Sequence, residues 1–505
     1  MKSYDVIFIH PPRTLKPHYG DNARIPRTSF IFLPMGVFAI ADYLETEGFG
    51  VQIINYPLEQ YLNRDWSLSE YLKTIDFNVC GIDLHWLHNS HAAIEVAKIV
   101  KKINPNAKVV LGGYSATYYH DQILKYFNMI DGIIRGDGEI PLLKYVQSLK
   151  QNSLFDSIPN LSYRNSSKHI KINDLTYTAQ TLDHLNFTNI ELLKNAKHYI
   201  DCSRRMMGIS FNLPVGRGCP FNCPYCAGGQ RAQERLAGRT KVTLRKPENV
   251  VEDINIMLEK YNIQSIFFGH GAYPASLKYW KKLLRLIQKE DIDIGGDLEI
   301  WRLPFPKEMW RQFYRTFRRR YSSISISPRT MSARVQQKIA KICDPTFNFP
   351  KKQINDLIRN ANLFQRTLRI WLTIGFPFQT RLDAQKDFIF SLKCMFKYGK
   401  SISKPITLMN EPYHIFPGSP AFESPESFRI KLKYNSFPEV TDFFKRTKMS
   451  FFYNAINYDT EVFSGTSIRN ANILLFLSSA LNHITTGSKL PETRVKNIPT
   501  SNRNS

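Results

Sequence analysis

Short apolar runs alternate with amphipathic segments through the first 150 residues of this 505-residue chain. The runs have the length and β-branched content of buried strands, and they occupy residues 5–9, 50–54, 79–83, 108–111 and 131–134. Between them, residues 36–47 and 91–103 carry apolar side chains at helical spacing. Strands that alternate with helices predict an α/β fold with a doubly wound parallel sheet, Rossmann-like or flavodoxin-like. Ligands of such sheets bind beyond the carboxyl ends of the strands, so the residues that follow each strand are the binding candidates.

A second set of strand-like and helical runs lies between residues 206 and 420. The strand-like runs are at 209–213, 265–268, 323–326, 370–374 and 406–409, which predicts a parallel barrel or partial barrel. Composition then divides the chain into a doubly wound domain at 1–150, a linker with a small hairpin at 151–205, a barrel at 206–420, a helical cap at 421–484 and a disordered tail at 485–505.

Positive charge is concentrated in the second part of the chain. The net charge is +25, yet residues 1–150 hold 15 basic and 15 acidic side chains, so two units with different ligands are expected. Seven basic residues and one acidic residue lie between Arg217 and Lys246, and a further basic group lies at Arg315 and 318–320. Such groups attract phosphates or carboxylates, which allows an anionic substrate, but a solvated face is the interpretation we favour.

Apolar segments long enough for export or membrane insertion are absent from the pattern. The N-terminal run, residues 6–9, is shorter than the core of a signal peptide, and residues 473–481 fall far short of the ~20 residues that span a bilayer. We therefore expect a cytoplasmic protein without a membrane partner.

Three of the seven cysteines lie within eight residues, at Cys219, Cys223 and Cys226. Three thiolates at this spacing, on a loop after a strand, can hold three irons of a 4Fe–4S cube and leave the fourth iron open. A zinc site is the alternative, but zinc would need a fourth thiolate or imidazole, and no matching motif follows. Chance clustering is a second alternative.

The cysteine loop resembles the signature of the radical S-adenosylmethionine (SAM) superfamily, including the aromatic Tyr225 before the third cysteine. The resemblance implies a 4Fe–4S cluster on Cys219, Cys223 and Cys226, with SAM bound to the open iron. It also implies that electron transfer splits SAM to a 5′-deoxyadenosyl radical. Later turns resemble the SAM-contacting elements, and their candidate residues are Gly269, Gly271, Ser325, Ser327, Gly375 and Pro377. Asp297 and Glu299, after a further candidate strand, are either polar contacts or solvated.

Residues 1–150 resemble the cobalamin-binding domain that precedes many radical SAM enzymes. The candidate residues follow the strands and are Pro11, Pro12, Gly112, Gly113, Tyr114, Ser115, Gly136, Gly138 and Glu139. The Asp-x-His-x-x-Gly motif of proteins that supply an axial histidine is absent, so we expect a corrin without a histidine on its lower face. His85, Trp86 and His88 then either line the pocket or merely pack, and a sheet that binds nothing is the broader alternative.

These resemblances predict a cobalamin-dependent radical SAM enzyme that methylates an unactivated carbon of a small-molecule or peptide substrate. One SAM would methylate cobalamin, a second would supply the radical, and a flavodoxin- or ferredoxin-type protein would supply electrons. A radical rearrangement, cyclisation or oxidation without methylation is one alternative. A corrinoid or nucleic-acid binding protein with a structural cluster is another. Nucleic acid is disfavoured, since tRNA methylthiotransferase relatives carry a second cysteine trio, whereas residues 1–150 contain only Cys80.

Overall fold

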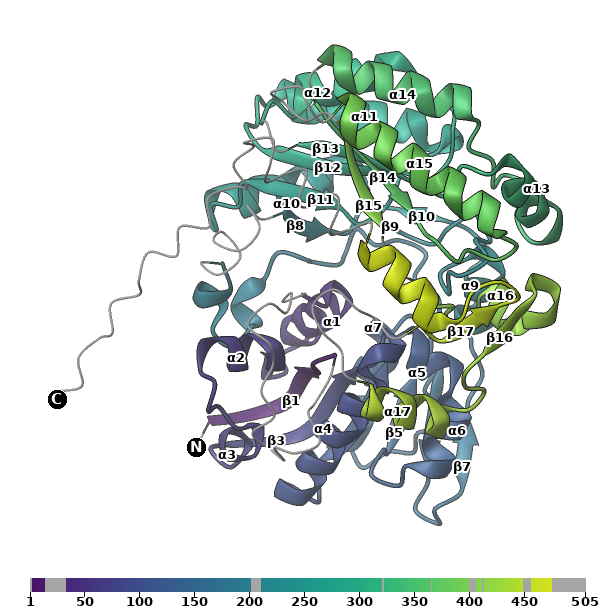
Figure 1. Ribbon diagram of the computed structural model, residues 1–505. Helices are drawn as coiled ribbons and strands as arrows, with labels where there is room; N and C mark the ends of the chain where they lie inside the picture. Colours follow the sequence, from purple (N-terminus) through teal and green to yellow (C-terminus); the bar gives the residue numbers. More distant parts are fainter. Residues whose placement is uncertain are drawn as a thin grey trace.

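Two α/β units, each built on its own parallel sheet, make up most of the molecule (Figure 1). The computed structural model describes residues 2–13, 33–200, 210–319, 322–364, 366–398, 406–410, 413–447 and 456–474. The tail predicted at 485–505, Ile209 of the expected strand 209–213 and Cys202 lie outside these residues.

The first unit is a seven-stranded sheet in the order β2-β1-β3-β4-β5-β6-β7. Its first five strands in this order are parallel, which is the flavodoxin-like arrangement expected from the sequence. The strands are β1 (Lys2–His10), β2 (Val51–Asn55), β3 (Ile75–Asp83), β4 (Lys108–Gly112), β5 (Gly132–Ile134), β6 (Leu161–Arg164) and β7 (Ile170–Ile172). The hairpin expected within 151–205 is β6–β7, and it pairs antiparallel with β5, so this part of the segment extends the sheet.

Helices of the first unit connect these strands on both faces of the sheet. They are α1 (Met35–Thr46), α2 (Tyr56–Leu62), α3 (Leu68–Leu72), α4 (Ser90–Ile103), α5 (Tyr114–Tyr118), α6 (His120–Tyr126) and α7 (Glu139–Lys150), with a 3-10 turn η2 (Leu87–Asn89) before α4 and η3 (Ile190–Leu192) beyond β7. Residues Val6–His10 of β1 are all buried, as a central strand covered on both faces requires.

The second unit is a six-stranded parallel sheet in the order β15-β14-β13-β12-β11-β8. The strands are β8 (Ser210–Leu213), β11 (Ser265–Phe268), β12 (Gly295–Ile300), β13 (Ser323–Arg329), β14 (Thr367–Leu372) and β15 (Ile406–Asn410). Strands in chain order with helical crossovers form a partial (β/α) barrel, as the sequence predicts. A short antiparallel pair, β9 (Gly216–Arg217) and β10 (Thr243–Leu244), lies between β8 and β11 in the chain.

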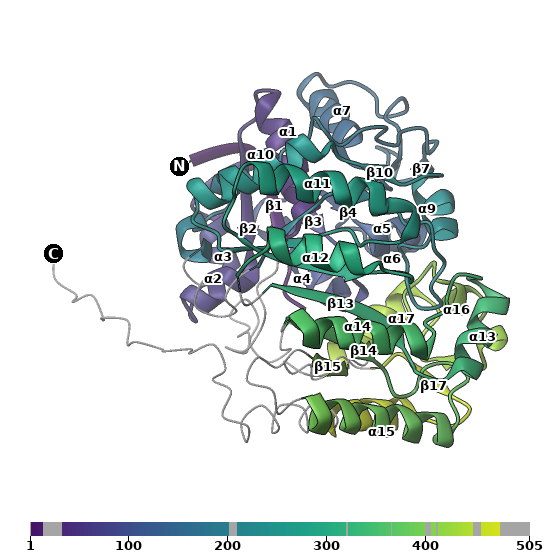
Figure 2. The same cartoon turned by 90° about the horizontal axis from the view of Figure 1, so that it is seen from above.

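The helices of the second unit are α9 (Gln230–Ala237), α10 (Pro247–Glu259), α11 (Leu277–Lys289), α12 (Lys307–Thr316), α13 (Ala333–Ile342), α14 (Lys351–Phe364) and α15 (Arg381–Tyr398), with a 3-10 turn η4 (Pro274–Ser276) before α11. Most of them cover the side of the sheet away from the first unit, whereas α9 lies against α5 of the first unit (Figures 1 and 2). Of these, α10, α11 and α12 lie in front of the first unit when the molecule is seen from above (Figure 2).

The strands of the second sheet have one apolar and one polar face. Phe268 of β11 contacts Trp280 of α11, with ring centroids 5.3 Å apart, so this row of side chains packs under the helices. Glu299 pairs in register with Ser325, and Ser325 with Arg369, on the opposite face. The polar row therefore faces the first unit.

The C-terminal part of the chain returns to the first unit. The cap predicted to be helical at 421–484 contains α17 (Phe437–Arg446), the short α16 (Pro420–Glu423) and η5 (Pro425–Phe428), but also an antiparallel pair, β16 (Ile430–Leu432) with β17 (Tyr458–Thr460). The pair forms because residues far apart in the chain, including the buried Ile430 and Tyr458, meet across it. α17 lies on the first unit, where Phe437 contacts Tyr119 and Phe127.

No helix in the described part of the chain is long and apolar enough to cross a membrane.

Candidate functional site

The cysteine loop runs from β9 to α9, and each of its thiols has an N–H donor. The Gly228 amide donates to Cys226 Sγ at 3.3 Å, and Arg302 Nη2 donates to Cys223 Sγ at 3.2 Å. The backbone N–H of Phe221 lies near Cys219 and opposes the rise in the pKa of that thiol, which burial causes. Burial, followed by the neighbouring thiol of Cys223, raises the pKa of Cys226 to about 11, so a bound metal centre would favour the ionised form of this thiol.

The donor set fits an iron–sulfur cube with one open iron. A structural zinc ion takes four protein ligands, whereas three thiolates bind three irons of a cube and leave the fourth iron open. Hydrogen bonds to the sulfurs, such as those from Gly228 and Arg302, are among the interactions that set the potential of such a cluster.

Tyr225 is fixed by the second unit and by the C-terminal part of the chain. Arg329 Nε donates to its hydroxyl at 3.2 Å, and its ring lies 4.6 Å from that of Tyr413. Its carbonyl accepts the Phe416 amide at 3.2 Å. The segment around Phe416 thus lies against the cysteine loop.

The two carboxylates expected near SAM differ in their surroundings. The structure places both within β12 rather than after it. Asp297 is buried, accepts a hydrogen bond from Ser323 and pairs with Arg369 at 3.1 Å, so it is not solvated. Glu299 accepts the hydroxyl of Ser327 at 2.6 Å and lies near enough to raise the pKa of Cys226. Of the two carboxylates, Glu299, with Ser327 bound to it, is therefore the one that lies toward the cysteine loop.

The candidate glycines of the second unit are closely packed positions. A Cβ on Gly271 would lie 2.3 Å from the indole of Trp301, and one on Gly375 would lie 2.3 Å from Ile468. A Cβ on Gly269 would lie 2.9 Å from Asn212. Pro377 is buried beside Gly375. Neighbouring side chains pack against these turns. A ligand could therefore contact only the backbone N–H and C=O groups of these glycines.

The carboxyl edge of the first sheet holds most of the cobalamin candidates. Gly113 has φ +101°, and a Cβ there would lie 2.7 Å from the His85 backbone. Ser115 donates its hydroxyl to the His85 carbonyl at 2.9 Å, which joins the turns after β3 and β4. Gly112 has no atom within 4 Å of an added Cβ, so the edge is open at this residue.

Other candidates at this edge are held by the protein. Pro11 and Pro12 are buried or nearly so, and the Pro11 carbonyl accepts Asn89 at 2.8 Å. A Cβ on Gly138 would lie 3.0 Å from Ile40, and one on Gly136 would lie 3.0 Å from Ala237 of α9. The turn after β5 therefore touches the second unit.

A buried ion-pair network joins this turn to the cysteine loop. Arg217 pairs with Glu139 and, at 3.2 Å, with Asp137, and Arg239 pairs with Asp137. Glu139, expected to face the cofactor, is fully buried and binds Arg217 instead. The expectation of a solvated basic face is wrong for Arg217 and Arg239, and also for Arg245, which pairs with Asp253 at 2.6 Å.

Aromatic side chains fill the space between the two edges. Tyr114 lies close enough to Cys226 and Cys219 that, after burial, their charges further raise its pKa. The His85 ring lies 4.5 Å from Trp86 and 5.4 Å from Tyr114. Trp86 is 45% exposed and contacts Phe416 at 5.3 Å. The cobalamin edge and the cysteine loop thus face each other across this aromatic group.

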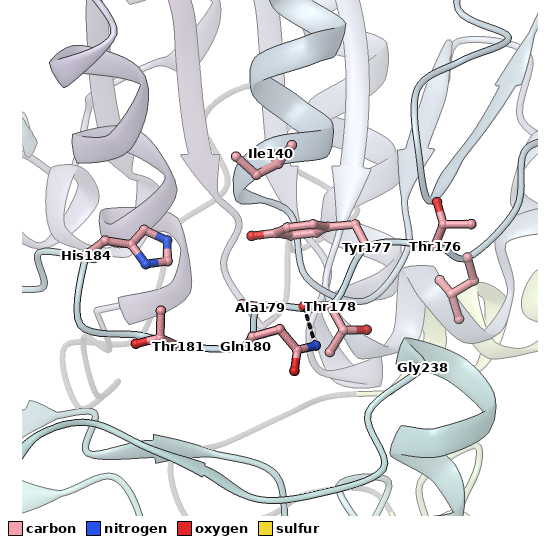
Figure 3. A pocket seen from close by; sticks show the side chains of 10 residues that line it. Ile140, Thr176, Tyr177, Thr178, Ala179, Gln180, Thr181, His184 and Gly238 are labelled. Atoms are coloured by element: carbon pink, nitrogen blue, oxygen red, sulfur yellow. Dashed lines mark hydrogen bonds between the residues drawn. The ribbon is translucent and has the colours of Figure 1, made fainter.

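A cavity of about 640 Å³ lies outside this junction (Figure 3). It is lined by residues 175–181, with Ile140, His184 and Gly238. Gly238 follows the C-terminal end of α9, whereas the cysteine loop precedes this helix in the chain, and none of the three cysteines lines the cavity.

Sequence reasoning missed Arg302, Asp344, Arg329 and Tyr413. Arg302 follows β12 by two residues, so the rule that binding residues follow strands could have found it. Nothing in the local sequence marks Asp344.

Comparison with known proteins identifies both units. Residues 27–146 match the B12 binding domain, and residues 213–381 match the radical SAM superfamily. The chain is a radical SAM protein with an N-terminal B12-binding domain. Within the superfamily it belongs with the cobalamin-dependent enzymes, whose cofactors are a 4Fe–4S cluster, SAM and cobalamin, as the sequence predicts.

Relatives share this architecture at low identity. The uncharacterized methyltransferase PH0819 of Pyrococcus horikoshii is 24% identical over 368 residues, which are 73% of this chain and 74% of that protein. An anaerobic magnesium-protoporphyrin IX monomethyl ester cyclase of Rubrivivax gelatinosus is 24% identical over 264 residues, 51% of this chain and 43% of the cyclase. The structure of the radical SAM methyltransferase TsrM from Kitasatospora setae, with tryptophan and a SAM analogue, has a TM-score of 0.62 at 14% identity and covers 84% of this chain and 76% of TsrM.

Proposed function

We propose that this enzyme methylates an unactivated carbon of a small-molecule or peptide substrate. The observation that carries the proposal is the link through Phe416, whose ring lies 5.3 Å from Trp86 at the cobalamin edge and whose amide donates to the Tyr225 carbonyl of the cysteine loop at 3.2 Å. A carbon radical and a methyl donor must meet at one substrate, so the two cofactor sites must face each other. Methyltransferases among the relatives support this reaction class.

The side chains of this chain then have distinct tasks. Cys219, Cys223 and Cys226 would hold the cluster, which with SAM supplies a 5′-deoxyadenosyl radical, while cobalamin supplies the methyl group. Glu299 and Ser327 would bind polar groups of SAM. Gly112 leaves room for the corrin, and Tyr114 with Trp86 would exclude water between the sites.

Reactions without methylation form the second candidate. The match to the cyclase of Rubrivivax gelatinosus favours a radical cyclisation or oxidation on the same architecture. The two candidates differ in their products from SAM. Methylation yields S-adenosylhomocysteine together with 5′-deoxyadenosine, whereas the alternative yields 5′-deoxyadenosine alone.

The test is anaerobic reconstitution with iron, sulfide and hydroxocobalamin, followed by SAM and a low-potential flavodoxin or chemical reductant. We expect retained corrinoid and about one equivalent of S-adenosylhomocysteine per corrinoid, even without substrate. Corrinoid retention with 5′-deoxyadenosine but no S-adenosylhomocysteine would favour the cyclase-type reaction. The C219A/C223A/C226A variant is the control, and iron retained by that variant would contradict the cluster assignment.

A further inference from the structure

Arg302 places a buried positive charge on one thiol of the cysteine loop. The residue is only 5% exposed, and its Nη2 lies 3.2 Å from Cys223 Sγ. The other two thiols receive uncharged backbone N–H groups, so Cys223 alone among the three has a charged donor in the described structure. A guanidinium keeps its charge under all ordinary conditions.

The orientation of this guanidinium is determined by its remaining contacts. Nη1 donates to the Trp301 carbonyl at 2.6 Å, and Nε donates to Thr346 Oγ1 at 3.1 Å. The guanidinium carbon, Cζ, lies 4.1 Å from the ring centroid of Phe221, so this ring covers one face of the guanidinium group. Phe347 and Phe349 lie at 5.4 and 5.8 Å, so apolar rings surround the charge and strengthen its field.

Asp344 is the acidic partner of Arg302 and also a support of the loop. It is 3% exposed and forms an ion pair with Nη2 of Arg302. Its Oδ2 also accepts the backbone N–H of Asn222 at 3.3 Å, one residue before Cys223. The pair therefore presents its positive end to the sulfur and its negative end to the loop backbone.

We propose that Arg302 and Asp344 tune the reduction potential of the iron–sulfur cluster through Cys223, in opposite directions. Reduction of the cluster adds one electron, supplied by an external low-potential donor, and makes the thiolate cluster more negative. A cation at Cys223 favours the reduced state and raises the potential, whereas the Asp344 carboxylate opposes it. The inference rests on the three cysteines holding the cluster.

The experiment is an EPR-monitored redox titration of the reconstituted full-length enzyme, with iron and sulfide measured in each sample. R302Q keeps a donor but loses the charge, and we expect its reduction equilibrium to fall about tenfold, which is ~59 mV for one electron. R302K should stay close to the wild type. D344N keeps an acceptor for Asn222 but loses the negative charge, so its potential should rise.

R245Q is the matched control, because it breaks another buried Arg–Asp pair that touches no thiol. Potentials of R302Q and D344N that equal those of R245Q and the wild type, or that move in the same direction, would overturn the proposal. If R302Q fails to hold iron, D344N decides: a potential above those of R245Q and the wild type supports the proposal, and an equal or lower potential overturns it. A wild type that binds no iron would instead overturn the cluster assignment, and the proposal with it.

Discussion

Glu299 and Asp297 illustrate how two carboxylates on one strand acquire different roles. Both project from the polar face of β12. Asp297 is bound by Arg369 and Ser323, while Glu299 accepts the Ser327 hydroxyl and lies beside the cysteine loop. Position along the strand, rather than residue type, therefore gives the two carboxylates different surroundings.

We expect E299Q to weaken SAM binding about tenfold or more, since a charged hydrogen bond contributes roughly 1.5–3 kcal/mol. D297N should leave SAM binding unchanged and lower the thermal midpoint, because it removes the charge that pairs with Arg369. Anaerobic calorimetric titration of the cluster-loaded variants with SAM measures the first effect. Equal SAM affinities of E299Q and the wild type would rule out contact between Glu299 and SAM.

His414 predicts a pH dependence of stability. Burial, opposed by the Asn457 side chain, lowers its pKa from 6.5 to about 4. At pH values between the two pKa values, His414 is protonated in the unfolded chain and neutral in the folded chain. The contribution of this residue to the free energy of unfolding is therefore complete above pH 6.5 and decreases as the pH falls toward about 4. Between about pH 7 and about pH 5, the thermal midpoint should therefore fall less for H414Q than for the wild type, and identical slopes would contradict the assignment.

At the scale of elements, the strands of both parallel sheets were predictable from the sequence. The short antiparallel pair of the C-terminal part and the ion pairs between distant residues were not. Apolar runs such as Val6–Ile9 predict buried strands because a strand covered on both faces has apolar side chains at successive positions. The β16–β17 pair escaped prediction because its strands are short and separated by α17. The Glu139–Arg217 and Arg302–Asp344 pairs join residues 78 and 42 positions apart, and local sequence carries no signal for such pairings.

Substitutions at Gly112 and Gly113, at the end of β4, should distinguish an effect on corrin binding from an effect on folding stability. G113A places a methyl group against the His85 backbone at positive φ, so we expect a loss of about 1–3 kcal/mol in unfolding free energy. G112A meets nothing within 4 Å, and its stability should match the wild type. If the corrin lies over this edge, G112A alone should lose hydroxocobalamin retention without losing stability. Denaturant unfolding and the absorption of desalted protein provide the two readouts, and a stable G112A that keeps full corrinoid would place the corrin elsewhere.

At the scale of the whole molecule, the buried network of Arg217 and Arg239 with Asp137 and Glu139 couples the two units. Removing one partner leaves an uncompensated buried charge, so R217M should cost about 3–5 kcal/mol. The double variant E139Q/R217M should recover part of this loss, since it buries one charge fewer. Thermal midpoints and corrinoid retention test this, and additive losses in the double variant would show that the pair is not coupled.

The return of α17 to the first unit has a consequence for how the chain can be divided. Phe437 contacts both Tyr119 and Phe127, and its amide donates to Gln122 at 2.8 Å, so the early and late parts of the chain form one surface. A protease cut in the connecting segment around residues 173–189 would therefore leave two fragments that remain associated. The N-terminal domain expressed alone would expose the apolar patch that α17 covers, so a soluble split enzyme needs both fragments made together.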